Sequence, residues 1–170
     1  MSVFSHAVRE VIVGRRGLIK ADPVWISIAL LLSISAKSGV PSEFSTGIKI
    51  FLATGLWAVA VILFNDLEDR REDAAAGKFR WIQTLPQRIA YFIPAAMVAA
   101  GGIIVLHCKN SLPALLIYLA ASISALSYSS SPFRFKDRGI LGPAAYSISC
   151  ALSYAVFPCI ILTGPPYILI

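Results

Sequence analysis

The feature that most restricts the fold of this chain is an apolar run, residues 50–64, that leads directly into an acidic stretch, residues 65–73. The run is typical of a membrane helix, so the acidic stretch is expected at the membrane boundary. On a helix that turns about 100° per residue, Asp66 and Asp73 point within about 20° of each other, and Asp69 lies about 60° to one side. The spacing therefore predicts three carboxylates on one face of the helix end.

Three neighbouring carboxylates repel one another and resist placement beside hydrocarbon. A hard divalent cation removes that penalty, and proteins usually hold Mg²⁺ through a few carboxylates together with substrate phosphates. We therefore predict a Mg²⁺ site at Asp66, Asp69 and Asp73, where Asn65 supplies a neutral oxygen or orients a carboxylate. At a membrane surface, the ligand expected for such a site is a lipid that carries a diphosphate.

The alternative for this stretch is an ordinary solvated helix in which Glu68, Arg71 and Glu72 form surface ion pairs. This alternative explains the mixed charge. It does not explain the clustered aspartates beside an asparagine, because helix interiors disfavour Asp and Asn relative to Glu and Gln. The pattern favours the metal site.

The composition is that of a polytopic membrane protein and not of a soluble domain. Of the 170 residues, 57% are apolar and only 14% are charged, and the mean hydropathy is +0.75. The net charge of +6 does not indicate a nucleic-acid partner, because the basic residues lie in short loops between apolar runs. The three cysteines lack the paired spacing of a zinc site or a redox motif.

We predict an all-α transmembrane bundle of about five spans. Residues 1–22 are expected to form a cytoplasmic amphipathic segment in the headgroup region, and residues 23–170 a single transmembrane helical domain. The predicted spans cover about 23–38, 45–65, 89–107, 112–128 and 140–163, and Gly77 is the expected helix stop in the polar segment 66–88.

The distribution of Lys and Arg predicts the orientation. With a cytoplasmic N-terminus, only Lys37, Lys49 and Lys109 of the 15 basic residues face outward, which leaves twelve inside. This bias indicates an integral protein of the inner (cytoplasmic) membrane. The acidic stretch and the loop after the fourth span then lie on the same, cytoplasmic face.

Basic side chains follow both the acidic stretch and the fourth span. Lys78 and Arg80 lie just beyond the aspartates, and Arg134 and Lys136 lie in the loop that follows Tyr128. Such cations are suited to the phosphate oxygens that a metal leaves free. The alternative is positive-inside charge for the basic residues and an aromatic-belt anchor for the tyrosine.

Two stretches of the chain match a known pattern. The first reads Asn65-Asp66-x-x-Asp69-x-x-x-Asp73, followed by Gly77-Lys78-x-Arg80. The second reads Tyr128-Ser129-x-x-Pro132-x-Arg134-x-Lys136-x-Arg138-Gly139-x-Leu141-Gly142. They resemble the NDxxDxxxD motif, and the loop after the fourth helix, of the UbiA superfamily of intramembrane prenyltransferases. The resemblance covers about residues 20–163.

The resemblance implies the first half of the UbiA fold and its chemistry. In the family, aspartates bind Mg²⁺, which grips a prenyl diphosphate; loss of diphosphate gives an allylic cation that an acceptor attacks within the membrane. The residues implied as metal-linked are Asp66, Asp69 and Asp73, and those implied for the diphosphate are Lys78, Arg80, Tyr128, Arg134 and Lys136. The implied partners are a prenyl diphosphate and membrane lipid.

The sequence also departs from the family pattern. Family members carry further membrane helices and a second aspartate motif, whereas no acidic residue follows Asp137 in this chain. We therefore expect no prenyl transfer by these 170 residues alone, because one carboxylate cluster cannot clamp a diphosphate from both sides. Two interpretations remain open. The chain is a prenyltransferase or its amino-terminal half, with a membrane partner supplying the missing helices, or it is an inactive relative that serves as a membrane subunit of a complex.

Overall fold

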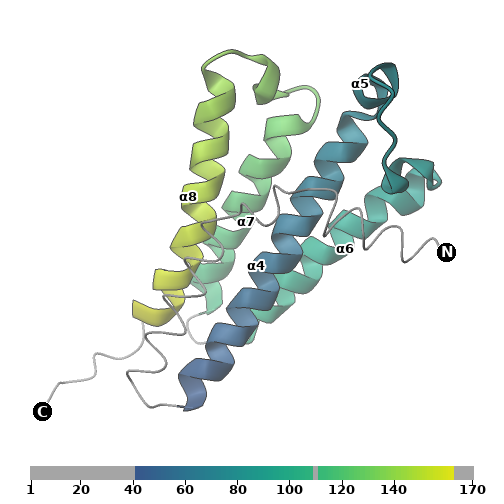
Figure 1. Cartoon of the computed structure of the whole chain (residues 1–170). Coiled ribbons are helices and arrows are strands. Elements are labelled where there is room, and N and C mark those ends of the chain that lie inside the picture. The colour runs from purple at the N-terminus through teal and green to yellow at the C-terminus, as the bar shows by residue number, and fades with distance from the viewer. Residues whose placement is uncertain (1–40, 109–110, 163–170) are drawn as a thin grey trace, which may run out of the picture. The chain divides into compact units, whose positions relative to one another are not determined.

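The computed structural model describes residues 41–108 and 111–162, and these form helices joined by turns, with no strand among them (Figure 1). The chain separates into two units, residues 1–47 and 48–170. All contacts described below belong to the second unit. The predicted amphipathic segment and the predicted span at 23–38 lie outside the described residues.

The described elements follow one another along the chain as helices of very different length. They are α4 (Pro41–Glu68), α5 (Arg70–Ala75), η2 (Trp81–Thr84), α6 (Gln87–Leu106), α7 (Ser111–Ser129), η3 (Phe135–Asp137) and α8 (Leu141–Leu162), where η denotes a 3₁₀ helix. The short elements lie in the two polar stretches that the sequence places between the long apolar helices.

Three helices within the described ranges are long and apolar enough to cross a membrane. They are Ser45–Glu68, Gln87–Leu106 and Leu112–Ser129. An integral membrane protein fits these helices, because a span needs about 20 predominantly apolar residues. The α8 helix occupies most of the predicted last span, residues 140–163. The total of five spans stays a prediction.

The short helix α5, which carries Asp73, stops where the sequence predicts a stop. α5 ends at Ala75, and Gly77 has a φ of 68°, a left-handed conformation that glycine adopts without steric cost. The amide of Gly77 bonds the carbonyl of Ala74 at 3.1 Å, which satisfies one of the last helical carbonyls. The chain therefore leaves α5 and folds back toward α6.

The 3₁₀ turn η2 is fixed by an apolar core beneath it. Ile82 is fully buried, and it packs in one cluster with Leu63 and Leu67 of α4 and with Ala90 of α6. Burying a side chain of this size stabilises the fold by about 1.5–3 kcal/mol. This core holds the turn after α5 against the end of α4, and so it fixes the backbone of the acidic stretch.

Farther along the bundle, α4, α6 and α7 meet at a glycine. A Cβ at Gly101 would overlap the Tyr118 hydroxyl and would lie 3.0 Å from the Ala53 carbonyl oxygen. The Tyr118 hydroxyl is buried there and donates a 3.0 Å hydrogen bond to the Val98 carbonyl of α6. Small residues allow helices to approach this closely in membranes.

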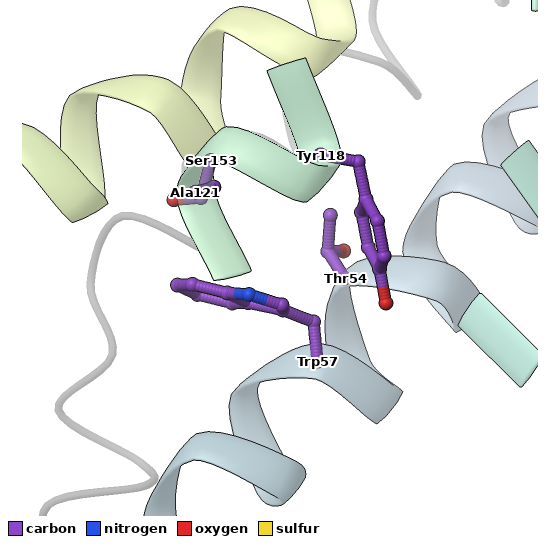
Figure 2. A pocket seen from close by; sticks show the side chains of 5 residues that line it. All are labelled: Thr54, Trp57, Tyr118, Ala121 and Ser153. Atoms are coloured by element: carbon purple, nitrogen blue, oxygen red, sulfur yellow. The ribbon is translucent and has the colours of Figure 1, made fainter. Parts of the chain in front are cut away.

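Beside this crossing, Thr54 and Trp57 of α4, Tyr118 and Ala121 of α7, and Ser153 of α8 surround a narrow gap. Figure 2 shows Thr54 beside the Tyr118 ring, with the Trp57 ring on the other side of the gap. The gap is too small to hold a water molecule, so we regard it as part of the packed interior. It offers no room for a ligand.

Candidate functional site

The acidic stretch spans the junction of α4 and α5. Asp66 belongs to α4, and only 6% of its surface is exposed. Asp69 is the residue between the two helices, yet its amide bonds Asn65 and its carbonyl accepts from the amide of Asp73 at 2.8 Å. The helical bonding therefore continues across the junction, and the aspartates keep nearly helical spacing. The side chain of Asp73 is also largely shielded, with 16% exposed.

The loop after α7 reaches this junction. The Lys136 ammonium contacts Oδ1 of Asp69, and the Arg134 guanidinium lies 3.6 Å from the same oxygen. The Lys136 side chain is 13% exposed and that of Asp69 is 21% exposed, so water screens their ion pair only in part. The sequence predicts both polar stretches on one face of the membrane, and these contacts bring the two stretches together.

Arg134 is held by two further carboxylates. It contacts Oε1 of Glu72, and its Nε lies 2.7 Å from Oδ2 of Asp137. Its backbone has a φ of 38°, in the left-handed region that residues with a Cβ rarely adopt. The alternative in which Glu72 only forms ion pairs on a solvated helix is incomplete, because this residue contacts Arg134 of the loop after α7.

A second set of contacts surrounds Asp73. The buried Gln83 of η2 donates from Nε2 to Oδ2 of Asp73 at 3.2 Å and to the backbone carbonyl of Asp66 at 2.7 Å. The Nε of Arg80 lies 3.8 Å from the same Asp73 oxygen. The backbone carbonyl of Gln83 in turn accepts a hydrogen bond from Arg70. This glutamine therefore ties the turn after α5 to the acidic helix end.

The side chain of Asn65 forms hydrogen bonds with both Asp69 and Ser129 of α7. Its Nδ2 donates to Oδ2 of Asp69 at 3.3 Å, and its Oδ1 accepts a hydrogen bond from the buried hydroxyl of Ser129 at the end of α7. Of the two roles that the sequence left open for this asparagine, the structure describes the orienting one. α4 and α7 are joined at this point by side-chain hydrogen bonding.

Two of the predicted phosphate-binding residues stay apart from these contacts. Lys78 is exposed, and within the described ranges its side chain makes no ion pair. Tyr128 packs against Tyr146 of α8, with ring centroids 6.1 Å apart, which fits the alternative of an aromatic anchor. The structure thus brings Arg80, Arg134 and Lys136 to the carboxylates but not these two side chains.

The surroundings of Lys136 affect its charge. Burial lowers the pKa of the Lys136 ammonium, and the neighbouring carboxylates of Asp137 and Glu68 offset part of that decrease. The Lys136 ammonium is therefore poorly hydrated, so an anionic ligand that binds it would displace little water from the ammonium.

The carboxylates do not by themselves form a metal site. Across residues 41–108 and 111–162, no three His, Cys, Asp or Glu side chains are grouped so that they could hold a metal ion. The reason lies in the pairing: Asp69 faces Lys136 and Arg134, whereas Asp73 faces Gln83 and Arg80. The oxygen donors suit Mg²⁺, but their arrangement does not fit a resident ion. In the described structure Lys136, Arg134 and Arg80 lie beside Asp69 and Asp73, and the binding of Mg²⁺ stays a prediction.

Sequence reasoning missed Gln83, Ser129 and the Glu72 contact. Gln83 lies in a polar segment with no motif of its own, and its burial depends on the apolar core under η2. Ser129 stands in a matched stretch, but nothing in its spacing indicated a bond to a residue 64 positions away. A search for polar residues beside buried apolar ones would have marked Gln83, which follows Ile82.

Comparisons with known proteins leave the family open: no family model, no curated protein and no solved structure matches the chain. The resemblance to the UbiA superfamily therefore rests on the two sequence stretches alone.

Proposed function

We propose that this chain is a UbiA-like membrane protein whose cytoplasmic cluster binds the headgroup of a prenyl diphosphate. One observation carries the proposal: the two stretches that resemble family motifs touch each other through Lys136, Arg134 and Asp69. Asp69 and Lys136 belong one to each motif and are 67 positions apart in the chain, and their contact is the arrangement that a shared ligand site requires. The apolar helices α4, α6 and α7 supply a membrane environment for the prenyl tail.

In this proposal the basic side chains bind the phosphates. Arg134 presents a planar fork of donors that suits phosphate oxygens, and Lys136 adds a point charge with reduced access to water. Arg80 and the exposed Lys78 border the same junction from the turn after α5. Mg²⁺ would then arrive with the diphosphate as part of the ligand, because the described carboxylates do not fit a resident ion.

The aspartates have a positioning role in this arrangement. Asp69 holds Lys136 and Arg134 in place before a ligand arrives, and Asn65 holds Asp69. Preorganised cations contribute more to anion binding than mobile ones, since the ligand does not have to order them. Transfer of the prenyl group to an acceptor would need a second carboxylate cluster, which these 170 residues do not contain. We therefore propose headgroup binding for this chain and transfer for an assembly with further helices.

The experiment is equilibrium binding of farnesyl diphosphate to the purified chain in lipid nanodiscs with Mg²⁺ present. We expect saturable binding that Lys136→Ala weakens by at least tenfold. Lys49→Ala is the matched control, because Lys49 lies near the opposite end of α4 and donates to the carbonyl of His107. Equal affinities of the Lys136 and Lys49 variants would refute the proposed site.

A second function is favoured by a specific observation. The charges of Arg134 and Lys136 are neutralised within the protein itself, by Asp69, Glu72 and Asp137. The cluster can therefore stabilise the packing of the loop after α7 on the α4–α5 junction without any ligand. The chain would then be a membrane subunit of a complex with no prenyl chemistry. This candidate predicts that Lys136→Ala lowers the free energy of unfolding and that farnesyl diphosphate does not bind, so the same experiment separates the two functions.

A further inference from the structure

Arg134 contacts more carboxylates than one cation needs. Glu72 touches the guanidinium, Asp137 lies 2.7 Å from its Nε, and Asp69 lies 3.6 Å away. Only Asp69 belongs to the set that the sequence assigned to the site. Glu72 and Asp137 therefore need an explanation of their own.

These three carboxylates are held with unequal strength. The side chains of Glu72 and Asp137 are 59% and 57% exposed, so each can leave Arg134 and be solvated at little cost. Asp69 is 21% exposed and is also fixed by Lys136 and by the Asn65 amide. The two outer carboxylates are thus the replaceable partners of the guanidinium.

The backbone at Arg134 is consistent with a segment that is held by its partners. Its φ of 38° and ψ of 54° belong to the left-handed region, and its amide bonds the carbonyl of Ser130 at 2.7 Å. Residues with a Cβ persist in this region only where their surroundings determine the conformation. Loss of the pairs with Glu72 and Asp137 would release part of that constraint.

We propose that Glu72 and Asp137 are internal competitors of the diphosphate, which occupy Arg134 until ligand phosphates displace them. The inference rests on the proposed function and deepens it, because it assigns these two residues to the control of ligand affinity. Phosphate oxygens replace the carboxylate oxygens at the guanidinium, and no covalent bond changes. The exchange keeps Arg134 neutralised in both states, which limits its capture of other anions.

The test measures the affinity for farnesyl diphosphate with Mg²⁺ in nanodiscs for Glu72→Gln and Asp137→Asn. Each variant removes a competitor, so we expect tighter binding by about two- to fivefold, the size expected for release of a part-exposed ion pair. Ala74→Lys is the charge control: it raises the net charge of the same short helix by one at an exposed position. It should tighten binding less than Glu72→Gln.

A second comparison isolates Arg134 from general charge. In an Arg134→Gln background, Glu72→Gln should tighten binding less than it does in the wild type, because only the 4.0 Å pair of Glu72 with Lys136 remains. An undiminished gain in this background, or a gain in the wild type no larger than that of Ala74→Lys, would overturn the exchange and leave the proposed function standing. Failure of both the wild type and the Glu72→Gln/Asp137→Asn double variant to bind would reject the proposed function and the exchange together.

Discussion

The crossing of α4, α6 and α7 at Gly101 makes a quantitative prediction about stability. A methyl group at this position would overlap the Tyr118 hydroxyl and lie 3.0 Å from the backbone oxygen of Ala53, which cannot move without shifting α4. Overpacking of this kind costs about 1–3 kcal/mol. Because Gly→Ala itself favours a helix by about 1 kcal/mol, the cost must be measured against a matched glycine.

Gly102 is that control. A Cβ there would meet Leu115 and Tyr118 carbon atoms at 3.7 Å, an ordinary van der Waals contact, and it gains the same helix propensity. We therefore expect Gly101→Ala to be less stable than Gly102→Ala by about 1–3 kcal/mol. Denaturant unfolding in detergent micelles, followed by circular dichroism, measures this difference in the free energy of unfolding.

The Tyr118 hydroxyl provides a second check on the same crossing. Tyr118→Phe alone loses the bond to the Val98 carbonyl and should cost about 1 kcal/mol. In the Gly101→Ala background the same change removes an overlapping atom, so it should cost less or restore stability. Equal stability of the two alanine variants, or strict additivity of Gly101→Ala with Tyr118→Phe, would refute the description of this crossing.

Three further predictions concern the polar junction and its side of the membrane. Ser129→Ala should lower the free energy of unfolding by about 1–2 kcal/mol, because it leaves the side-chain carbonyl oxygen of Asn65 without its buried donor. The control Ser127→Ala loses only a bond within its own helix and should change the free energy of unfolding by less than about 0.5 kcal/mol. Equal losses would contradict the bond between α4 and α7. Because the folded state lowers the pKa of Lys136, the unfolded chain binds more protons than the folded chain between the folded-state pKa and 10.5. The free energy of unfolding should therefore rise with pH across that window, and the rise should vanish in Lys136→Met. Parallel pH profiles of the wild type and the variant would contradict this prediction. Cysteines introduced at positions 78 and 109 in a cysteine-free background should be labelled from opposite sides of the membrane; labelling of both from one side would contradict the topology.

Much of the helical framework could be predicted from the sequence, because a long apolar run directly indicates a helix long enough to span a membrane. The runs at 45–65, 89–107 and 112–128 correspond to α4, α6 and α7, and Gly77 stops α5 as expected. The predicted end of the first run, residue 65, precedes the end of the helix, because α4 continues through Asp66 to Glu68. A polar residue ends a predicted span but does not end a helix.

The composition of the candidate site was predicted in part. Asp66, Asp69 and Asp73 all lie at the junction of α4 and α5 with little exposed surface, and the loop after α7 reaches the same junction. The partners of each carboxylate could not be predicted, because they depend on tertiary contacts. Lys136 and Gln83 reach different aspartates, and this division separates carboxylates that an isolated helix would present together.

The proposed function places a diphosphate headgroup between the acidic junction and the loop after α7. Photo-crosslinking locates the headgroup, with a prenyl diphosphate analogue that carries its reactive group next to the phosphates, bound to the chain in nanodiscs with Mg²⁺. We expect labelled peptides from both residues 65–84 and residues 129–138, with labelling suppressed by excess farnesyl diphosphate. Competed labelling confined to the opposite ends of the helices, near residues 45–52 and 104–108, or labelling that farnesyl diphosphate does not suppress, would contradict it.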